Sequence, residues 1–236
     1  MPRYADLHIL PHPEDTNSCQ RIAKALHMAG YSTVGLTLPT GLFQDRVVEI
    51  RNAFRDNGLD VFLRLDLSSR SREELLRSLR RFRNGYDIIA VKCSSARVAH
   101  VACRDRRVDL VFFDHENLNF RFTHALANLL QGALEMNLAS IMPGNLGPNI
   151  YVSISKQFDI ANEHRLKVVL SSGADRSELI RSPIQVAALA STLGLQERTA
   201  LEGVSSMPLS IVENNARKRN PTHIEDGVQI VPARVK

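Results

Sequence analysis

The sequence contains no tryptophan and only three cysteines, Cys19, Cys93 and Cys103, which are far apart and form no C-x-x-C pair. Such an odd, scattered set excludes a disulfide framework and a zinc ribbon, and it is typical of proteins in a reducing compartment, so we expect a cytoplasmic location. No apolar run reaches the roughly 20 residues of a membrane-spanning helix, and no membrane contact is expected. The first residues lead directly into a strand-like segment, which predicts that no secretory signal is present.

Several catalytic and nucleotide-binding motifs are also missing. No G-x-G-x-x-G pattern follows the first apolar run, and there is no Walker A loop. The sequence also has no G-x-S-x-G nucleophile elbow and no paired-carboxylate signature. The residues by themselves therefore specify no complete active site, and no residue is predicted to be catalytic.

Arginine is the residue type that stands out. Lysine and arginine total 30 against 25 acidic residues, which gives a net charge of +5, and 24 of the 30 basic residues are arginines. A guanidinium group binds phosphate in a bidentate manner and stacks on bases, so this bias favours a nucleic-acid partner. Codon bias in a GC-rich genome would produce the same enrichment, and the composition leaves that alternative open.

Short apolar runs alternate with helix-length amphipathic segments along the whole chain. Near-continuous hydrophobic strands with intervening helices indicate a parallel sheet that is covered on both faces. The length of 236 residues suits one TIM-type (β/α) barrel of roughly 250 residues, with a doubly wound sheet as the alternative. We predict a single α/β barrel domain over residues 1–216 and a basic C-terminal tail over 217–236. The predicted strands are 4–9, 33–38, 61–67, 88–92, 108–113, 138–142, 168–170 and 199–204, and the predicted helices are 18–29, 43–56, 72–83, 96–104, 122–136, 150–164, 184–193 and 208–219.

The segment 166–194 contains a candidate phosphate-binding loop. A buried strand leads into Ser171 and Ser172 and then a Gly-Ala pair, and Arg176 and Arg181 follow. Small residues after a parallel strand expose backbone N–H groups, which can bind a phosphate at the C-terminal end of a barrel. An ordinary strand-to-helix turn is the alternative. The Ser-Pro pair at 182–183 predicts the start of the next helix, and the glycine at 194 predicts its end.

The first strand carries a possible metal motif. Asp6 and His8 share one face of this strand, and His12 follows shortly after it. This D-x-H pattern resembles the opening motif of the polymerase-and-histidinol-phosphatase (PHP) phosphoesterases. Their usual closing motif ends in a ligand histidine, but the corresponding place here has Arg176 after Asp175. We therefore predict no metal site in the chain.

Further charged residues lie on predicted strands and helices. Arg64 and Asp66 share one face of a strand, where they form either a buried ion pair or part of a ligand site, and Lys92 ends the next strand. The helix 72–83 carries several arginines opposite its apolar stripe, and a second arginine group follows at 104–107. Such groups can neutralise phosphates, or they can form an ordinary solvated surface. His124 is expected to be a hydrogen-bonded structural histidine, and His164 falls in a predicted helix, where it faces either the core or solvent.

The last third of the chain resembles the archaeal ribonuclease P protein component 3 family, the counterpart of the thirty-kilodalton eukaryotic subunit. The resemblance extends loosely over earlier segments and is specific in the last third. It rests on Leu170-Ser171-Ser172-Gly173-Ala174, Arg181-Ser182-Pro183, Leu193-Gly194-Leu195, Ala200, Ser205–Pro208, Ile211-Val212 and the ending at 226–231. It implies a PHP-like barrel that has lost its metal site, in agreement with the incomplete motif at the first strand.

The resemblance also implies a function. The chain would be a non-catalytic subunit of ribonuclease P, whose RNA subunit uses Mg²⁺ to remove the 5′ leader of precursor tRNA. Its partners would be the ribonuclease P RNA, precursor tRNA, protein component 2 and further subunits of the enzyme. The RNA contacts expected from this match are Arg176, Arg181, Lys92, Arg64, Ser171 and Ser172, with no metal or cofactor held by the chain. A PHP-type metal-dependent phosphoesterase is the alternative, and a small-molecule barrel enzyme that binds a phosphorylated substrate is a third reading.

Overall fold

Seven parallel strands form the centre of the molecule in a computed structural model, which describes residues 3–113, 120–138, 148–219, 223–225 and 228–229. The strands are hydrogen-bonded in chain order. They are β1 (Ala5–Ile9), β2 (Thr33–Thr37), β3 (Asp60–Ser68), β4 (Ile88–Cys93), β5 (Leu110–Phe113), β6 (Ala133–Asn137) and β7 (Val168–Ser171). A parallel bridge between Ile9 and Ala174 joins the end of β1 to the segment after β7, and the Leu10 N–H donates to the Ala174 carbonyl at 2.9 Å. The strands therefore form a nearly closed barrel, and the predicted TIM-type α/β barrel is confirmed.

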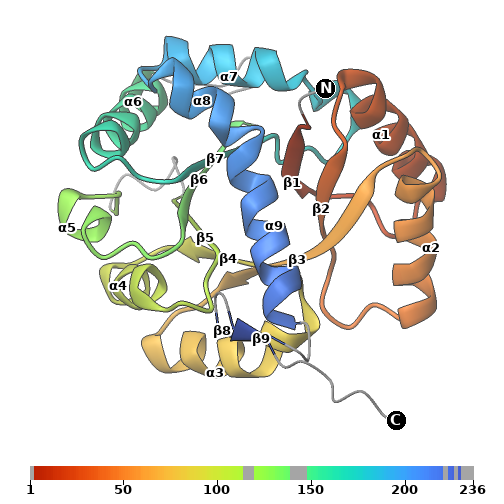
Figure 1. Ribbon diagram of the computed structural model, residues 1–236, viewed down its shortest axis with the longest axis horizontal. Helices are drawn as coiled ribbons and strands as arrows, with labels where there is room; N and C mark the ends of the chain where they lie inside the picture. The colour runs from red at the N-terminus through yellow and green to blue at the C-terminus, as the bar shows by residue number, and fades with distance from the viewer. Residues whose placement is uncertain (1–2, 114–119, 139–147, 220–222, 226–227, 230–236) are drawn as a thin grey trace.

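Helices surround the strands, and the last of them crosses in front of the barrel in Figure 1. In chain order they are α1 (Thr16–Ala29), α2 (Gln44–Arg55), α3 (Arg72–Phe82), α4 (Ala96–Arg104), α5 (His124–Ala127), α6 (Pro148–Glu163), α7 (Pro183–Thr192), α8 (Glu197–Gly203) and α9 (Ser206–Arg219). The described part of the tail contributes a small antiparallel pair, β8 (His223–Glu225) and β9 (Val228–Gln229). No helix among the described residues has both the length and the apolar character needed to cross a bilayer.

Serine side chains start three of the outer helices. Ser71, Ser95 and Ser182 each accept a hydrogen bond from a backbone N–H in the first turn of α3, α4 and α7. At α7 the side chain of Gln185 also accepts from the Ser182 N–H, so a complete capping box precedes the helix. Each such cap contributes about 1 kcal/mol to the stability of its helix. The predicted start of α7 at the Ser-Pro pair is thus confirmed.

Two predicted elements between residues 122 and 142 are wrong. The segment expected as one helix, 122–136, contains the short helix α5 and then strand β6. Of the strand expected at 138–142 the structure describes only Leu138, and this residue is not in a strand. The sequence of β6 is Ala-Leu-Glu-Met-Asn, whose first four residues all favour helices. Pairing with β5 and β7 outweighs this preference, because a strand at this place completes the barrel. Gly132 lets the chain enter β6 close to the backbone before β5, since a Cβ there would lie 2.5 Å from the Asp109 carbonyl oxygen.

The predicted eighth strand, 199–204, is also wrong, because this segment forms α8. Gly203 packs so closely that a Cβ would lie 3.1 Å from the Val168 carbonyl oxygen, and Ala200 is fully buried. Small residues on a helix face can pack onto β7 from outside the barrel. The chain then continues as α9, whose buried Val212 packs against the first residues of several strands. The Asn215 side chain donates to the Asp87 carbonyl at 3.0 Å, so α9 covers the end of the barrel where the strands begin.

The barrel interior changes from apolar to polar along the strands. Ala5, Ile88, Leu110 and Ala133, near the strand starts, pack together beneath α9. Charged and polar side chains fill the other end. Since functional groups of such barrels are found where the strands end, that end is the first place to look for a site. The predicted boundary at residue 216 falls inside α9, and 220–222, 226–227 and 230–236 of the predicted tail lie outside the described residues.

Candidate nucleic-acid interface

The predicted phosphate loop after β7 is filled by groups of the protein itself. The Ser172 N–H donates to the Asp6 carboxylate at 3.1 Å, and the Ala174 N–H donates to the Ser172 hydroxyl at 3.1 Å. Gly173 has φ +62°, and a Cβ on it would collide with the side chain of Asn137. The carboxylate of Asp6 thus takes the place that a phosphate would need. Burial raises the pKa of Asp6, although hydrogen bonds with Ser172 and from the His8 N–H act in the opposite direction.

Arg64 lies at the centre of an interior cluster that also contains Asp66, Glu135, His8 and Ser171. Its side chain has no exposed surface. The guanidinium donates to Glu135 in a bidentate manner, to Asp66 at 2.6 Å and to the Leu7 carbonyl at 3.0 Å. Ser171 donates its hydroxyl proton to Glu135 at 2.8 Å. Arg64 and its two carboxylates therefore form a buried ion-pair network, one of the two alternatives that the sequence left open.

The electrostatics of the interior cluster favour the charged forms of Arg64 and Asp66. Burial would lower the pKa of Arg64, but the carboxylates of Glu135 and Asp66 outweigh burial and raise it above its usual value. Burial would likewise raise the pKa of Asp66, but the charge of Arg64, followed by the contact with His8, holds this pKa well below its usual range. Charged partners inside a low-dielectric barrel stabilise one another in this way only when all of them are present.

The D-x-H motif of the first strand belongs to the same interior cluster. His8 Nε2 lies 3.2 Å from a carboxylate oxygen of Asp66 but makes no aligned hydrogen bond, and its Nδ1 lies 3.2 Å from the Asn137 amide nitrogen. Two carboxylates face the His8 ring, those of Asp66 and Glu135, and both are paired with Arg64. The guanidinium thus supplies the positive charge that a metal ion would otherwise bring to these carboxylates.

The predicted RNA contacts separate into buried and accessible residues. Ser171, Ser172 and Arg64 are buried, so their side chains do not reach RNA at the surface of this structure. Arg176 is exposed and lies 3.3 Å from Asp175, and Arg181 is half-buried and donates to two carbonyls of its own loop. Lys92 is half-buried and already has an interaction partner. For Arg176, Arg181 and Lys92, RNA contact stays a prediction.

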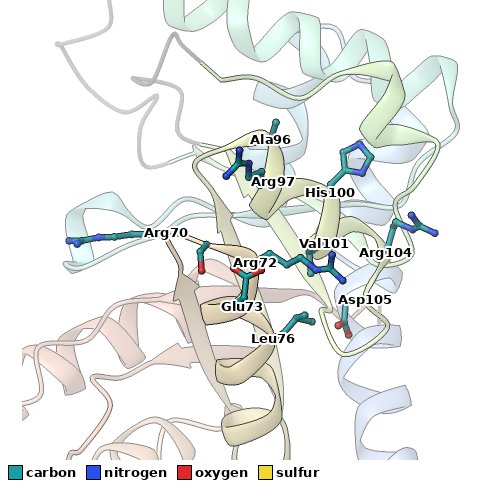
Figure 2. Close-up of a pocket in the computed structure, with 11 residues that line it drawn as sticks. Arg70, Arg72, Glu73, Leu76, Ala96, Arg97, His100, Val101, Arg104 and Asp105 are labelled. Atoms are coloured by element: carbon teal, nitrogen blue, oxygen red, sulfur yellow. The ribbon is translucent and has the colours of Figure 1, made fainter.

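A hollow lined by four arginines lies outside the barrel, between α3 and α4. We call it the arginine groove and define it by Arg70, Arg72, Arg97 and Arg104 together with His100. Its volume is about 890 Å³, and all five of these side chains are exposed. Figure 2 shows Arg72, Arg97, His100 and Arg104 around the hollow, while Arg70 extends away from them. Helical spacing produces this arrangement, because His100 and Arg104 stand one turn apart on the face of α4 that borders α3.

The arginine groove carries more positive than negative charge. Among the described residues, none of its four arginines lies within ion-pair distance of a carboxylate, although Glu73 places one negative charge near Arg72 and Arg97. Asp105 is bound by Arg107 at 2.6 Å. The pKa of Glu73 is lowered by its own N–H and by Ser71, and then by the nearby charges of Arg72 and Arg97. Free guanidinium groups around one hollow can bind several phosphates or carboxylates at once.

The floor of the arginine groove is apolar. Leu76, Ala96 and Val101 line it between the arginines. A phosphate chain with an unpaired base would satisfy both parts, because the base can lie on apolar and guanidinium surfaces while the phosphates meet the charges. The N-termini of α3 and α4, capped by Ser71 and Ser95, add partial positive charge beside the arginine groove.

Part of the arginine groove was visible in the sequence. The arginines of 72–83 and the group at 104–107 stood out there, but Arg97 and His100 did not. Arg97, His100 and Arg104 follow one another at i, i+3 and i+7 along α4, whose bounds were predicted correctly. This spacing indicates a basic face of the helix. Glu135, the main partner of Arg64, was missed for another reason, since it was expected to lie in a helix.

Comparisons with known proteins agree closely with one another. A family model described as RNase P subunit p30 matches residues 3–220. Ribonuclease P protein component 3 of Methanosarcina barkeri is 24% identical over 238 residues, which cover 98% of this chain and 96% of that protein. Ribonuclease P protein subunit p30 of Mus musculus is 34% identical over 129 residues, which cover 51% of this chain and 46% of that protein.

A solved structure has the same fold. A chain in the cryo-EM structure of archaeal ribonuclease P with mature tRNA superimposes with a TM-score of 0.80 at 18% sequence identity. The match covers 98% of this chain and all of that chain. The two chains thus share the same overall fold.

Proposed function

The chain belongs to the RNase P subunit p30 family, and we propose that it serves ribonuclease P by holding folded RNA in the arginine groove. As a family member it is a protein subunit of ribonuclease P, the enzyme that matures the 5′ end of tRNA. Its expected role in that enzyme is to support catalysis by the RNA rather than to cleave RNA itself. The interior cluster supports this view, because Arg64 already pairs with the carboxylates near His8.

The observation that carries the proposal is the set of unpaired guanidinium groups between α3 and α4. Folded RNA brings phosphates close together, and their repulsion must be screened by Mg²⁺ or by protein cations. Four exposed arginines in one hollow supply fixed positive charge for this purpose. We therefore expect the chain to lower the Mg²⁺ concentration that the RNA needs. Protein component 2, the ribonuclease P RNA and precursor tRNA are the proposed partners.

Reconstituted cleavage of a precursor tRNA tests the proposal. The reaction contains the ribonuclease P RNA and protein component 2 at low Mg²⁺, with or without this chain. We expect cleavage to require the chain, and the variant Arg72→Gln/Arg97→Gln/Arg104→Gln to need more Mg²⁺ than the wild type. The matched control removes three exposed arginines from other helices, Arg21→Gln/Arg55→Gln/Arg198→Gln, and should behave as the wild type does.

The outcomes of this experiment are distinct. If both triple variants lose the same activity, total charge matters and the arginine groove does not. If neither loses activity, RNA is held elsewhere, and Arg176 and Arg181 become the residues to change. Cleavage by the isolated chain with Mn²⁺ would contradict the non-catalytic role and favour the phosphoesterase alternative.

A further inference from the structure

Three metal-ligating side chains meet on the outer surface where α5 approaches the end of α6. His124 Nδ1 lies 3.0 Å from His164 Nε2 and 3.5 Å from Glu163 Oε2. All three donor atoms lie within 4.8 Å of one another. The side chains of His124 and Glu163 are 59% and 65% exposed, so an ion from solvent can reach them. Nothing in the proposed RNA-binding role uses this group.

The two histidines are held by separate elements. His124 is the first residue of α5, directly after the N-cap Thr123, whose hydroxyl accepts from the Leu126 N–H. His164 follows the last residue of α6, and its N–H still donates to the Ile160 carbonyl at 3.0 Å. Arg165 then turns the chain with φ +50°. Both imidazoles therefore start from fixed backbone positions.

The spacing of the donor atoms fits a tetrahedral ion. With metal–ligand bonds of about 2.0–2.1 Å, the corners of a tetrahedron lie about 3.3–3.4 Å apart. The observed separations of 3.0 and 3.5 Å lie on either side of that value. The third separation, between His164 and Glu163, is within 4.8 Å. Rotation of the exposed Glu163 side chain can bring its carboxylate to the same centre, and solvent can supply the fourth ligand.

We propose that His124, Glu163 and His164 form a binding site for one divalent transition-metal ion, with Zn²⁺ as the best-matched cation. Two imidazole nitrogens and one carboxylate oxygen are a ligand set that Zn²⁺ accepts readily. Mg²⁺ prefers an all-oxygen shell and keeps its water, so it does not suit this site. The C-terminal end of α6 carries partial negative charge, which adds attraction for a cation. The bound ion would join α5 to α6.

Calorimetric titration of the untagged full-length chain with ZnCl₂ tests the site. We expect one ion per chain. His124→Ala and His164→Ala should each lower the affinity by at least about tenfold, the loss that even second-shell partners of a metal site cause, and Glu163→Gln should lower it less. His27→Ala is the matched control, because His27 is an exposed helical histidine outside this group. The Zn²⁺ affinity of this variant should equal that of the wild type.

Cobalt provides a second measurement that does not depend on affinity alone. Co²⁺ added to the wild-type chain should give the visible absorption of a tetrahedral ion, and His124→Ala/His164→Ala should abolish it while His27→Ala keeps it. Absence of saturable Zn²⁺ binding, equal affinity of the histidine variants and the wild type, or equal binding of Mg²⁺ would each overturn the proposal.

Discussion

Arginine performs opposite tasks in the interior cluster and in the arginine groove. Arg64 has no exposed surface, and its donors meet Glu135, Asp66 and the Leu7 carbonyl. Arg72 and Arg97 stand in solvent on the outer helices and meet no carboxylate among the described residues at ion-pair distance. The difference shows that burial and partners decide what an arginine contributes. A buried, fully paired guanidinium stabilises the fold, whereas an exposed, unpaired one is available to a ligand.

The largest effect is expected inside the barrel. Arg64→Met should lower the free energy of unfolding by about 3–5 kcal/mol, because the carboxylates of Glu135 and Asp66 would stay buried without their partner. Urea denaturation followed by circular dichroism measures this loss. Arg55→Met, at an exposed position on α2, should change stability by less than about 0.5 kcal/mol.

A double variant sharpens this prediction. Arg64→Met/Glu135→Leu leaves no unpaired charge at Glu135, so it should recover part of the stability that Arg64→Met loses. If Arg64→Met were as stable as the wild type, the interior cluster would not be structural and the contrast between the two groups of arginines would fail.

A smaller, pH-dependent effect is expected at Asp66. Burial would raise the pKa of its carboxyl group, but Arg64 and His8 hold this pKa well below its usual range in the folded state. Asp66 therefore contributes stability that is fully present above its unfolded pKa of about 4 and is lost as the pH falls toward the folded pKa. Asp66→Asn should cost about 1–3 kcal/mol near neutral pH.

The pH dependence of this cost is the informative measurement. The difference in free energy of unfolding between wild type and Asp66→Asn should be constant down to about pH 4 and should shrink below it. Urea denaturation at several pH values measures it. A difference that stays constant through the acid range would mean that the charge of Asp66 does not stabilise the barrel.

The fold could be predicted wherever local pattern and tertiary structure agree. The capped helix α7 and the apolar runs of β1 to β5 and β7 carry clear local signals, and the barrel follows from their alternation. The strand β6 could not be found, because Ala-Leu-Glu-Met favours a helix and only pairing with β5 and β7 makes it a strand. The prediction of a strand at 199–204 was wrong for a related reason, since the small residues of this segment fit a helix packed against β7.

The site was less accessible to sequence reasoning than the fold. The pair Arg64 and Asp66 was visible in the alternation of β3, but its burial depends on Glu135, which is 71 positions away from Arg64. The arginine groove needs two helices side by side, and periodicity describes only one helix at a time. His124 and His164 meet across 40 positions. In each case the missing information is a contact between distant segments.

The most direct test of the central claim is the salt dependence of RNA binding. The affinity of the chain for the ribonuclease P RNA is measured over a range of salt concentrations for the wild type, the Arg72→Gln/Arg97→Gln/Arg104→Gln variant and the Arg21→Gln/Arg55→Gln/Arg198→Gln control. If the arginine groove holds phosphates, the first variant should bind more weakly, and its log–log slope should be smaller in magnitude by about 2–3, with the control close to wild type. Equal slopes for all three proteins would contradict the claim that these arginines hold RNA.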